Sequence, residues 1–126
     1  MTTPTQGIVL FAHGSRDPLW RAPIEAVEAH IRAHHPGVAV RCAYLELTTP
    51  DLPQAVEDLV DQGATAVTIV PMFLGTGKHA REDLPMLVAE LRARHPRVQV
   101  HVQAAIGEDP RMTALMAHIA CTPPAQ

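Results

Sequence analysis

The chain repeats itself after 60 residues without a gap. Residues 32–40, RAHHPGVAV, align with residues 92–100, RARHPRVQV, and Pro50 aligns with Pro110. Because apolar positions elsewhere in the two halves keep the same register, each half is expected to fold into the same β-α-β-α unit. This duplication favours folds in which strands and helices alternate.

Four segments carry apolar residues at helical spacing. They are Ile24, Val27 and Ile31; Leu52, Val56 and Leu59; Leu84, Leu87 and Leu91; and Met112, Leu115, Met116 and Ile119. Gly63 suits the end of the second helix, whereas Pro36 and Pro96 stop the first and the third. The first two helices therefore align with the last two.

Strands are expected between these helices, at residues 7–13, 38–45, 66–73 and 98–104. The first and third are almost wholly apolar, as in strands covered on both faces, whereas the second and fourth alternate, which is typical of edge strands. Alternation of strands and helices predicts parallel pairing with right-handed crossovers. The simplest α/β fold is a four-stranded parallel sheet in the order 2-1-3-4, with helices on both faces, two on each.

The length of 126 residues fits one domain. We expect this domain to span residues 7–121, with the repeats at about 7–62 and 67–121. The ends, residues 1–6 and 122–126, are expected to be flexible tails.

Composition narrows the class of protein. A hydrophobic content of 47% and a charged content of 18% fit a globular core, and a net charge of −3 without a basic stripe disfavours a nucleic-acid binder. No run reaches the length of a membrane helix, and no basic segment precedes the apolar run at 8–12 as in a signal peptide. We therefore expect a cytoplasmic protein without membrane contact, with Cys42 and Cys121 as reduced thiols.

Three polar residues lie at or beyond the ends of predicted strands: His13, Glu46 and His79, each 33 residues from the next. In a sheet of order 2-1-3-4, the first three strands end at one edge, and ligands bind there, at the switch point between strands 1 and 3. Two imidazoles and a carboxylate suit a divalent transition metal or proton transfer. The repeat replaces His13 by Phe73, so this edge is asymmetric.

Simpler interpretations remain open for each residue. His13 can cap a turn, and Glu46 can be a solvated surface carboxylate. The loop 75–79, GTGKH, resembles a phosphate-binding loop, but a Walker A motif requires glycine where Met72 stands and serine or threonine where His79 stands. Nucleotide binding is therefore disfavoured.

Other histidines are interpreted as structural or solvated. His30 and His34 have the i,i+4 spacing of a zinc site, but a helix end is a favourable place for a solvated cation. His118 lies off the apolar stripe of the last helix, and Trp20 is interpreted as a core or interface residue.

Three motifs in order resemble the CbiX-type sirohydrochlorin chelatases: HGSR at 13–16, LE at 45–46 and PMFLGTGKHAREDLP at 71–85. The resemblance covers essentially residues 7–120. It implies a lyase that inserts Co²⁺, Fe²⁺ or Ni²⁺ into the tetrapyrrole sirohydrochlorin for cobalamin or siroheme biosynthesis, with no ATP and no Mg²⁺ requirement. A chain of this length resembles the short, single-domain form, which acts as a homodimer.

The resemblance also assigns roles to residues. His13 and His79 would bind the metal and act in catalysis, with Glu46 as their catalytic acidic partner. Sirohydrochlorin is a polycarboxylate, so Arg16, Lys78 and Arg81 are expected to form a basic rim. The expected substrate-binding residues are Gly14, Ser15, Arg16, Phe73, Leu74, Gly75, Lys78 and Arg81. The apolar floor for the ring is expected from Phe11, Met72, Phe73 and Leu74.

Two other functions stay open: a metal- or tetrapyrrole-binding protein without turnover, and a phosphoryl-transfer enzyme with a histidine nucleophile. The second is disfavoured because histidine phosphatases place an arginine where this chain has Ala12. The sequence does not select the metal, the pathway or the number of macrocycles bound per dimer.

Overall fold

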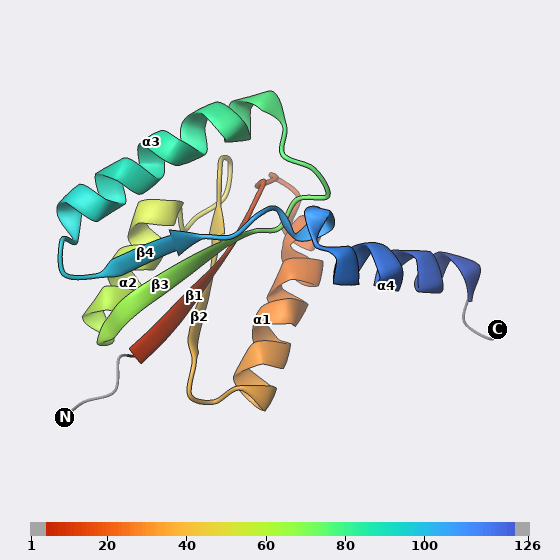
Figure 1. Cartoon of the computed structure of the whole chain (residues 1–126), viewed down its shortest axis with the longest axis horizontal. Coiled ribbons are helices and arrows are strands. Elements are labelled where there is room, and N and C mark those ends of the chain that lie inside the picture. Colours follow the sequence, from red (N-terminus) through yellow and green to blue (C-terminus); the bar gives the residue numbers. More distant parts are fainter. Residues whose placement is uncertain (1–4, 123–126) are drawn as a thin grey trace.

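The structure, a computed structural model, describes residues 5–122 and contains one four-stranded sheet. All strand pairs are parallel, in the order β2-β1-β3-β4, which confirms the predicted topology (Figure 1). The strands are β1 (Thr5–Ala12), β2 (Ala39–Tyr44), β3 (Ala64–Pro71) and β4 (Gln99–Val102). The helices are α1 (Ala22–His34), α2 (Leu52–Asp61), α3 (Lys78–Arg94) and α4 (Pro110–Cys121), with short 3-10 helices η1 (Pro18–Arg21) and η2 (Ile106–Glu108).

The ends of the chain differ slightly from the expectation. β1 begins at Thr5 and pairs with β3 from there, so residues 5 and 6 are strand rather than tail. Thr122 caps α4 through its backbone N–H. The rest of the expected tails, residues 1–4 and 123–126, lies outside the described residues.

The two faces of the sheet are covered unequally. On one face, α2 and α3 bury a large core with Val9, Ile69 and Phe11. On the other face, α1 packs through Ile24 on a smaller core at β1, β2 and the end of β3. The part of this face formed by β4 carries polar residues, because apolar and polar residues alternate along that strand.

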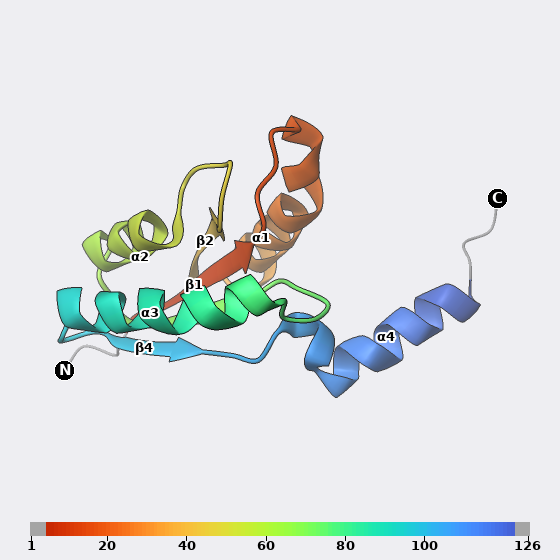
Figure 2. The same cartoon turned by 90° about the horizontal axis from the view of Figure 1, so that it is seen from above.

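The expectation of two helices on each face is wrong for α4. This helix has no buried residue, and Leu115 and Ile119 are 49% and 58% exposed. Figures 1 and 2 show α4 extending away from the sheet in both views. Its principal contact is with η2, which fixes its starting point but does not cover its apolar stripe.

The repeat is visible in individual contacts as well as in the topology. The Arg32 guanidinium donates to the carbonyl of Val40, and Arg92 donates to the carbonyl of Val100, each from a helix end to the following strand. Gly63 ends α2 as predicted, with φ +99. The duplicated halves therefore share their local construction, and α4 is where they diverge.

Candidate functional site

His13 and Glu46 meet at the C-terminal edge of the sheet. His13 follows β1 and Glu46 follows β2, and the backbone N–H of Leu45 donates to the carbonyl of Ala12 at 2.8 Å, which continues the pairing of these strands beyond their ends. The Nδ1 atom of His13 lies 3.3 Å from Oε1 of Glu46, and both side chains are about half exposed. This confirms that the sheet brings the two residues together.

A glycine allows this close approach. A Cβ atom on Gly14 would lie 1.7 Å from the carbonyl oxygen of Glu46, so no side chain fits there. Thr48 fastens the same two loops, because its hydroxyl accepts from the N–H of Ser15 at 3.1 Å and donates to the carbonyl of Ser15 at 2.8 Å. Leu47 between them has φ +65, a left-handed conformation that is uncommon for leucine. The backbone here is shaped to hold His13 beside Glu46.

Sequence reasoning missed two residues that position His13. The indole Nε1 of Trp20 donates to the carbonyl oxygen of His13 at 2.9 Å, and the Thr48 hydroxyl binds the backbone of Ser15, two residues after His13. Trp20 is 53% exposed, so of its two interpretations, as a core or an interface residue, the first is wrong and the second stays a prediction. A hydroxyl two residues after Glu46 was the available signal for Thr48; the contact of Trp20 has no local sequence pattern.

Phe73 lies against the ring of His13. Their ring centroids are 4.8 Å apart, and Phe73 also contacts Phe11 edge-on at 6.2 Å. Phe73 is 6% exposed and Phe11 1% exposed. Phe11 therefore belongs to the core and is not part of an open floor for a ring, whereas Leu74, at 74% exposed, is available at the surface.

His79 is not part of the His13 and Glu46 pair. It lies in the first turn of α3, beyond the loop of residues 72–77, and it is exposed. Within residues 5–122, no three histidine, cysteine, aspartate or glutamate side chains lie close enough to hold one metal ion. Of the three residues that were expected to cluster, His13 and Glu46 are in contact, whereas His79 follows β3 at the same edge of the sheet and is separate from that pair.

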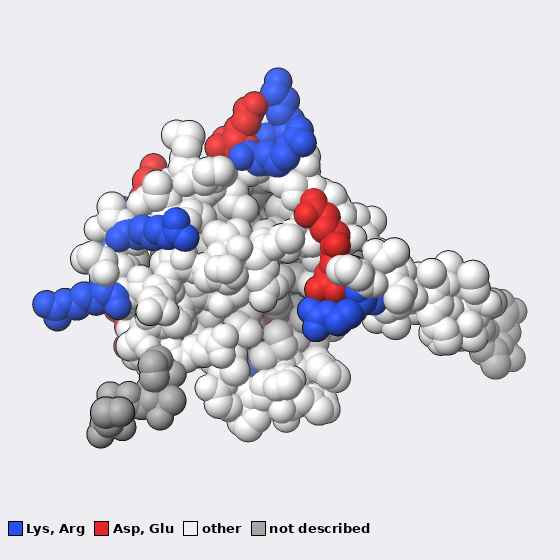
Figure 3. All heavy atoms as spheres, in the orientation of Figure 1, with Lys and Arg blue, Asp and Glu red and all other residues white. Residues whose placement is uncertain are grey.

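Basic side chains surround this edge. Arg16, Lys78 and Arg81 are exposed, and none of them takes part in the ion pairs found among residues 5–122. Figure 3 shows basic and acidic side chains gathered at the beginning of α3, where Glu82 and Asp83 follow Arg81. The Ser15 hydroxyl accepts from the N–H of Asp17, so that side chain already has a role in the turn.

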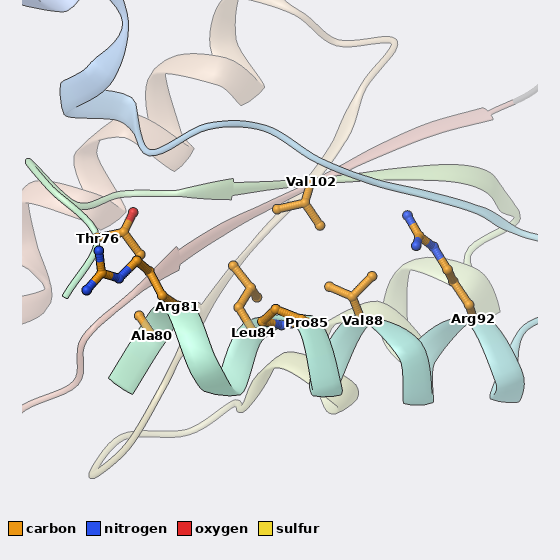
Figure 4. Close-up of a pocket in the computed structure, with 8 residues that line it drawn as sticks. All are labelled: Thr76, Ala80, Arg81, Leu84, Pro85, Val88, Arg92 and Val102. Atoms are coloured by element: carbon orange, nitrogen blue, oxygen red, sulfur yellow. The ribbon is translucent and has the colours of Figure 1, made fainter. Parts of the chain in front are cut away.

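A groove of about 430 Å³ runs between α3 and the edge strand β4. Figure 4 shows Arg81 near one end and Arg92 near the other, with Leu84 and Val88 between them. Arg92 is already bonded to the carbonyl of Val100. The groove thus starts near His79 but leads along the helix, away from His13.

Cysteine chemistry is remote from this edge. Cys42 and Cys121 form no disulfide with each other; Cys42 is buried and Cys121 is exposed. Burial, followed by the negative charge of Glu28, raises the pKa of the Cys42 thiol to about 12. A thiol so far from ionisation is a poor metal ligand.

The fold and site define an α/β protein with a histidine–glutamate pair at the C-terminal edge of a parallel sheet. The chain belongs to the CbiX family, whose model matches residues 7–121. No helix among the described residues is both long and apolar enough to cross a membrane.

Individual relatives are about a third identical to the chain over the aligned residues. A sirohydrochlorin cobaltochelatase of Methanococcoides burtonii is 33% identical over 82 residues, which are 65% of this chain and 63% of the relative. A sirohydrochlorin ferrochelatase of Bacillus subtilis is 30% identical over 113 residues, 90% of this chain but 43% of the relative. The matches thus leave more than a third of each relative uncovered.

Solved structures agree with the fold. A CbiX protein of Marinobacter aquaeolei, described as a putative cobalamin biosynthesis protein, superposes with a TM-score of 0.79 at 32% identity and covers 92% of this chain and 94% of its own. The sirohydrochlorin chelatase SirB of Bacillus subtilis subspecies spizizenii, in complex with cobalt, gives 0.78 at 29% identity and covers 93% of this chain and 50% of its own. One copy of the present fold therefore corresponds to half of that chain.

Proposed function

We propose that this chain is a lyase that inserts a divalent metal ion, Co²⁺, Fe²⁺ or Ni²⁺, into sirohydrochlorin, for cobalamin or siroheme biosynthesis. The observation that carries the proposal is the contact of 3.3 Å between His13 Nδ1 and Glu46 Oε1 at the switch point of a CbiX-family sheet. The names of the relatives, cobaltochelatase and ferrochelatase, supply the substrate class.

The pair matches what the reaction requires. Insertion exchanges two pyrrole N–H protons for one metal ion, so the protein must accept protons and hold the ion loosely. When Nδ1 of His13 carries its proton, it donates to Glu46 and leaves the Nε2 lone pair free for a metal or a proton. A neutral imidazole is a borderline ligand, which suits an ion that must be released to the ring.

His79 and the basic residues complete the proposed site. His79 is exposed at the start of α3, beyond the strand next to the one that precedes His13, and it would act on a ring held over His13 from that side. Arg16, Lys78 and Arg81 would bind the carboxylates of the ring, and Leu74 would contact its apolar face. Gly75 and Gly77 lie in the loop before α3, and a Cβ atom added to either glycine would meet nothing within 4 Å. The space beside the loop is therefore open to a bulky ligand.

We propose no role for ATP or Mg²⁺. The loop before α3 departs from the Walker A pattern at Met72 and at His79. We also propose a cytoplasmic location without nucleic-acid or membrane partners, supported by the two free thiols and the net charge of −3.

The protein is proposed to act as a homodimer in which the two sheet edges face a shared cleft. SirB spans about twice the length matched here, so a second copy of this chain would supply the facing wall. Such an interface would bury on the order of 1,200–2,000 Å² in total.

An anaerobic metallation assay tests the function. Purified protein should convert metal-free sirohydrochlorin into its metal complex without ATP or Mg²⁺, followed by absorbance; a strict ATP requirement would refute the class of enzyme. His13→Ala and His79→Ala should each lower the rate at least about tenfold, on the order of 1.4 kcal/mol of barrier. His34→Ala and His118→Ala should stay near wild type.

The same variants separate the alternatives. A binding protein without turnover would give no rate above the spontaneous reaction, although it would still shift the spectrum of the bound ring. Loss of turnover in His13→Ala with ring binding retained would instead support the enzyme. Equal losses in all four variants would mean that the site is misplaced.

A further inference from the structure

The apolar stripe of α4 has no partner within the described residues of its own chain. Met112 and Met116 are only partly covered, and Leu115 and Ile119 are largely exposed. From Met112 to Thr122 the chain has no Asp, Glu, Lys or Arg, and Figure 3 shows this part of the helix without charged side chains. An uncharged helix with an open apolar stripe requires a cover of the same character.

A matching groove lies on the thinly covered face of the sheet. It measures about 300 Å³ and lies beside α1, near the C-terminal edge of the strands. Its lining is wholly uncharged and mostly apolar: Ala12, Trp20, Pro23, Ile24, Val27 and Met72. Trp20 and Val27 are among the large apolar side chains that this chain leaves exposed, at 53% and 37%.

The root of α4 directs the helix away from this groove. The N–H of Gly107 donates to the carbonyl of Phe73 at 2.9 Å, and a Cβ on Gly107 would lie 2.0 Å from the carbonyl oxygen of Leu74. The carboxylate of Asp109 then caps α4 and binds the guanidinium of Arg111 at 3.0 and 2.7 Å. Because η2 is locked against the loop after β3, α4 leaves the sheet edge in a fixed direction, outward (Figures 1 and 2).

We propose that α4 of one copy docks into the Trp20 groove of a second copy, and that the exchange is reciprocal. This inference rests on the homodimer of the proposed function, but not on its metal chemistry. A helix of this length is about 18 Å long. A stable dimer buries roughly 1,200–2,000 Å² in total, so each of the two reciprocal contacts would supply up to about half of that area. Groove and helix root both lie at the C-terminal edge, so the exchange keeps the two edges close together, as a shared cleft requires.

The exchange has a consequence for the site. Trp20 donates its indole N–H to the carbonyl of His13, so the partner's helix would close over the side chain that holds His13 in place. Trp20 thereby becomes a positioning residue whose environment reports on the dimer. It is also the only tryptophan of the chain, which makes its fluorescence a specific probe.

The first experiment combines light scattering with tryptophan emission on the full chain. Wild type should have twice the mass of one chain and a blue-shifted emission maximum. The double variant Leu115→Glu/Ile119→Glu should become monomeric with red-shifted emission, whereas Ala114→Glu, on the opposite side of α4, should leave both unchanged. A monomeric wild type, or a double variant that stays dimeric with unchanged emission, would overturn the exchange.

The second experiment locates the helix directly and uses a Cys121→Ser background. Val27→Cys on a tagged chain and Leu115→Cys on an untagged chain, when mixed and oxidised, should give a disulfide-linked heterodimer. Ala114→Cys in place of Leu115→Cys should give several-fold less. If the two cysteines pair only when placed in one monomeric chain, α4 folds back on its own sheet and the exchange is wrong. Neither readout uses metallation, so each proposal can fail alone.

Discussion

Helices α2 and α4 occupy equivalent positions in the duplicated halves, yet they have opposite environments. Leu59 of α2 is fully buried against the sheet, whereas Ile119, its equivalent in α4, is 58% exposed. Both helices have the apolar spacing that predicts an amphipathic helix. The difference teaches that such spacing identifies a helix with an apolar face. It does not show whether the surface that covers this face belongs to the same chain.

The edges of the two halves differ in the same way. His13 and Glu46 in the first half are replaced by Phe73 and Ile106 in the second, and His79 corresponds to the exposed Leu19. Phe73 even packs on the ring of His13, its equivalent. The duplicated scaffold thus carries its proposed chemistry on an asymmetric set of residues.

The largest expected effect is a difference in stability between core substitutions in α2 and the equivalent substitutions in α4. Leu59→Ala should lower the free energy of unfolding by about 2–5 kcal/mol, because it leaves a cavity in the core. Ile119→Ala should cost no more than about 0.5 kcal/mol in dilute protein. Urea denaturation at increasing protein concentration measures both, and equal costs at low concentration would contradict the unpacked position of α4.

A second substitution tests the contact that builds the site. Gly14→Ala places a methyl group on the carbonyl of Glu46, so the loops must separate, at a cost of about 1–3 kcal/mol. Gly37→Ala is the matched control, because a Cβ there meets nothing within 4 Å. Thermal unfolding compares them; a neutral Gly14→Ala would mean that the two loops are not held in contact.

The substitution Glu46→Gln tests whether the Glu46 carboxylate takes part in the proposed reaction. Loss of its charge beside Nδ1 of His13 should lower the metallation rate about 10–100-fold while the fold is retained. Glu57→Gln, an exposed position on α2, is the control and should behave as wild type. An unchanged rate in Glu46→Gln would remove Glu46 from the proposed mechanism.

The smallest effect concerns alkaline stability. Burial raises the pKa values of the Cys42 thiol and the Tyr44 hydroxyl to about 12, above their ordinary values of 9.0 and 10.0. Because the unfolded chain loses these protons first, their contribution to stability is complete below about pH 9 and is lost as the pH rises toward 12. Unfolding measured from pH 8 to 11 should therefore show falling stability, with a shallower slope in Cys42→Ala and an unchanged slope in Cys121→Ser.

Much of the fold was predictable because its determinants are local and repeated. The apolar runs of β1 and β3, the alternation in β2 and β4, and the glycine after α2 each follow from short stretches of sequence. The strand order then followed from the rules of parallel connection. The position of α4 could not be predicted, because it is set by the close contact of Gly107 with the Leu74 backbone and not by the helix itself.

The site was predictable to a smaller extent. The meeting of His13 with Glu46 followed from two adjacent parallel strands ending at one edge. His79 lies beyond a loop, whose path no strand register dictates, so its distance from the pair did not follow. Thr48 and Trp20 act through backbone atoms of other residues, and such contacts leave no periodic trace in the sequence.

The central claim, that the polar residues replaced in the repeat carry the chemistry, is tested most directly by exchanging the two histidines, His13 and His79, for their repeat equivalents. The measurement is the initial rate of anaerobic metallation of sirohydrochlorin, without ATP or Mg²⁺, by His13→Phe and His79→Leu against wild type. His34→Arg and His101→Arg, exchanged in the same way at positions remote from the edge, serve as controls. We expect at least a tenfold loss in the first pair, on the order of 1.4 kcal/mol, and rates near wild type in the second. A His13→Phe variant that folds and metallates at the wild-type rate would contradict the account.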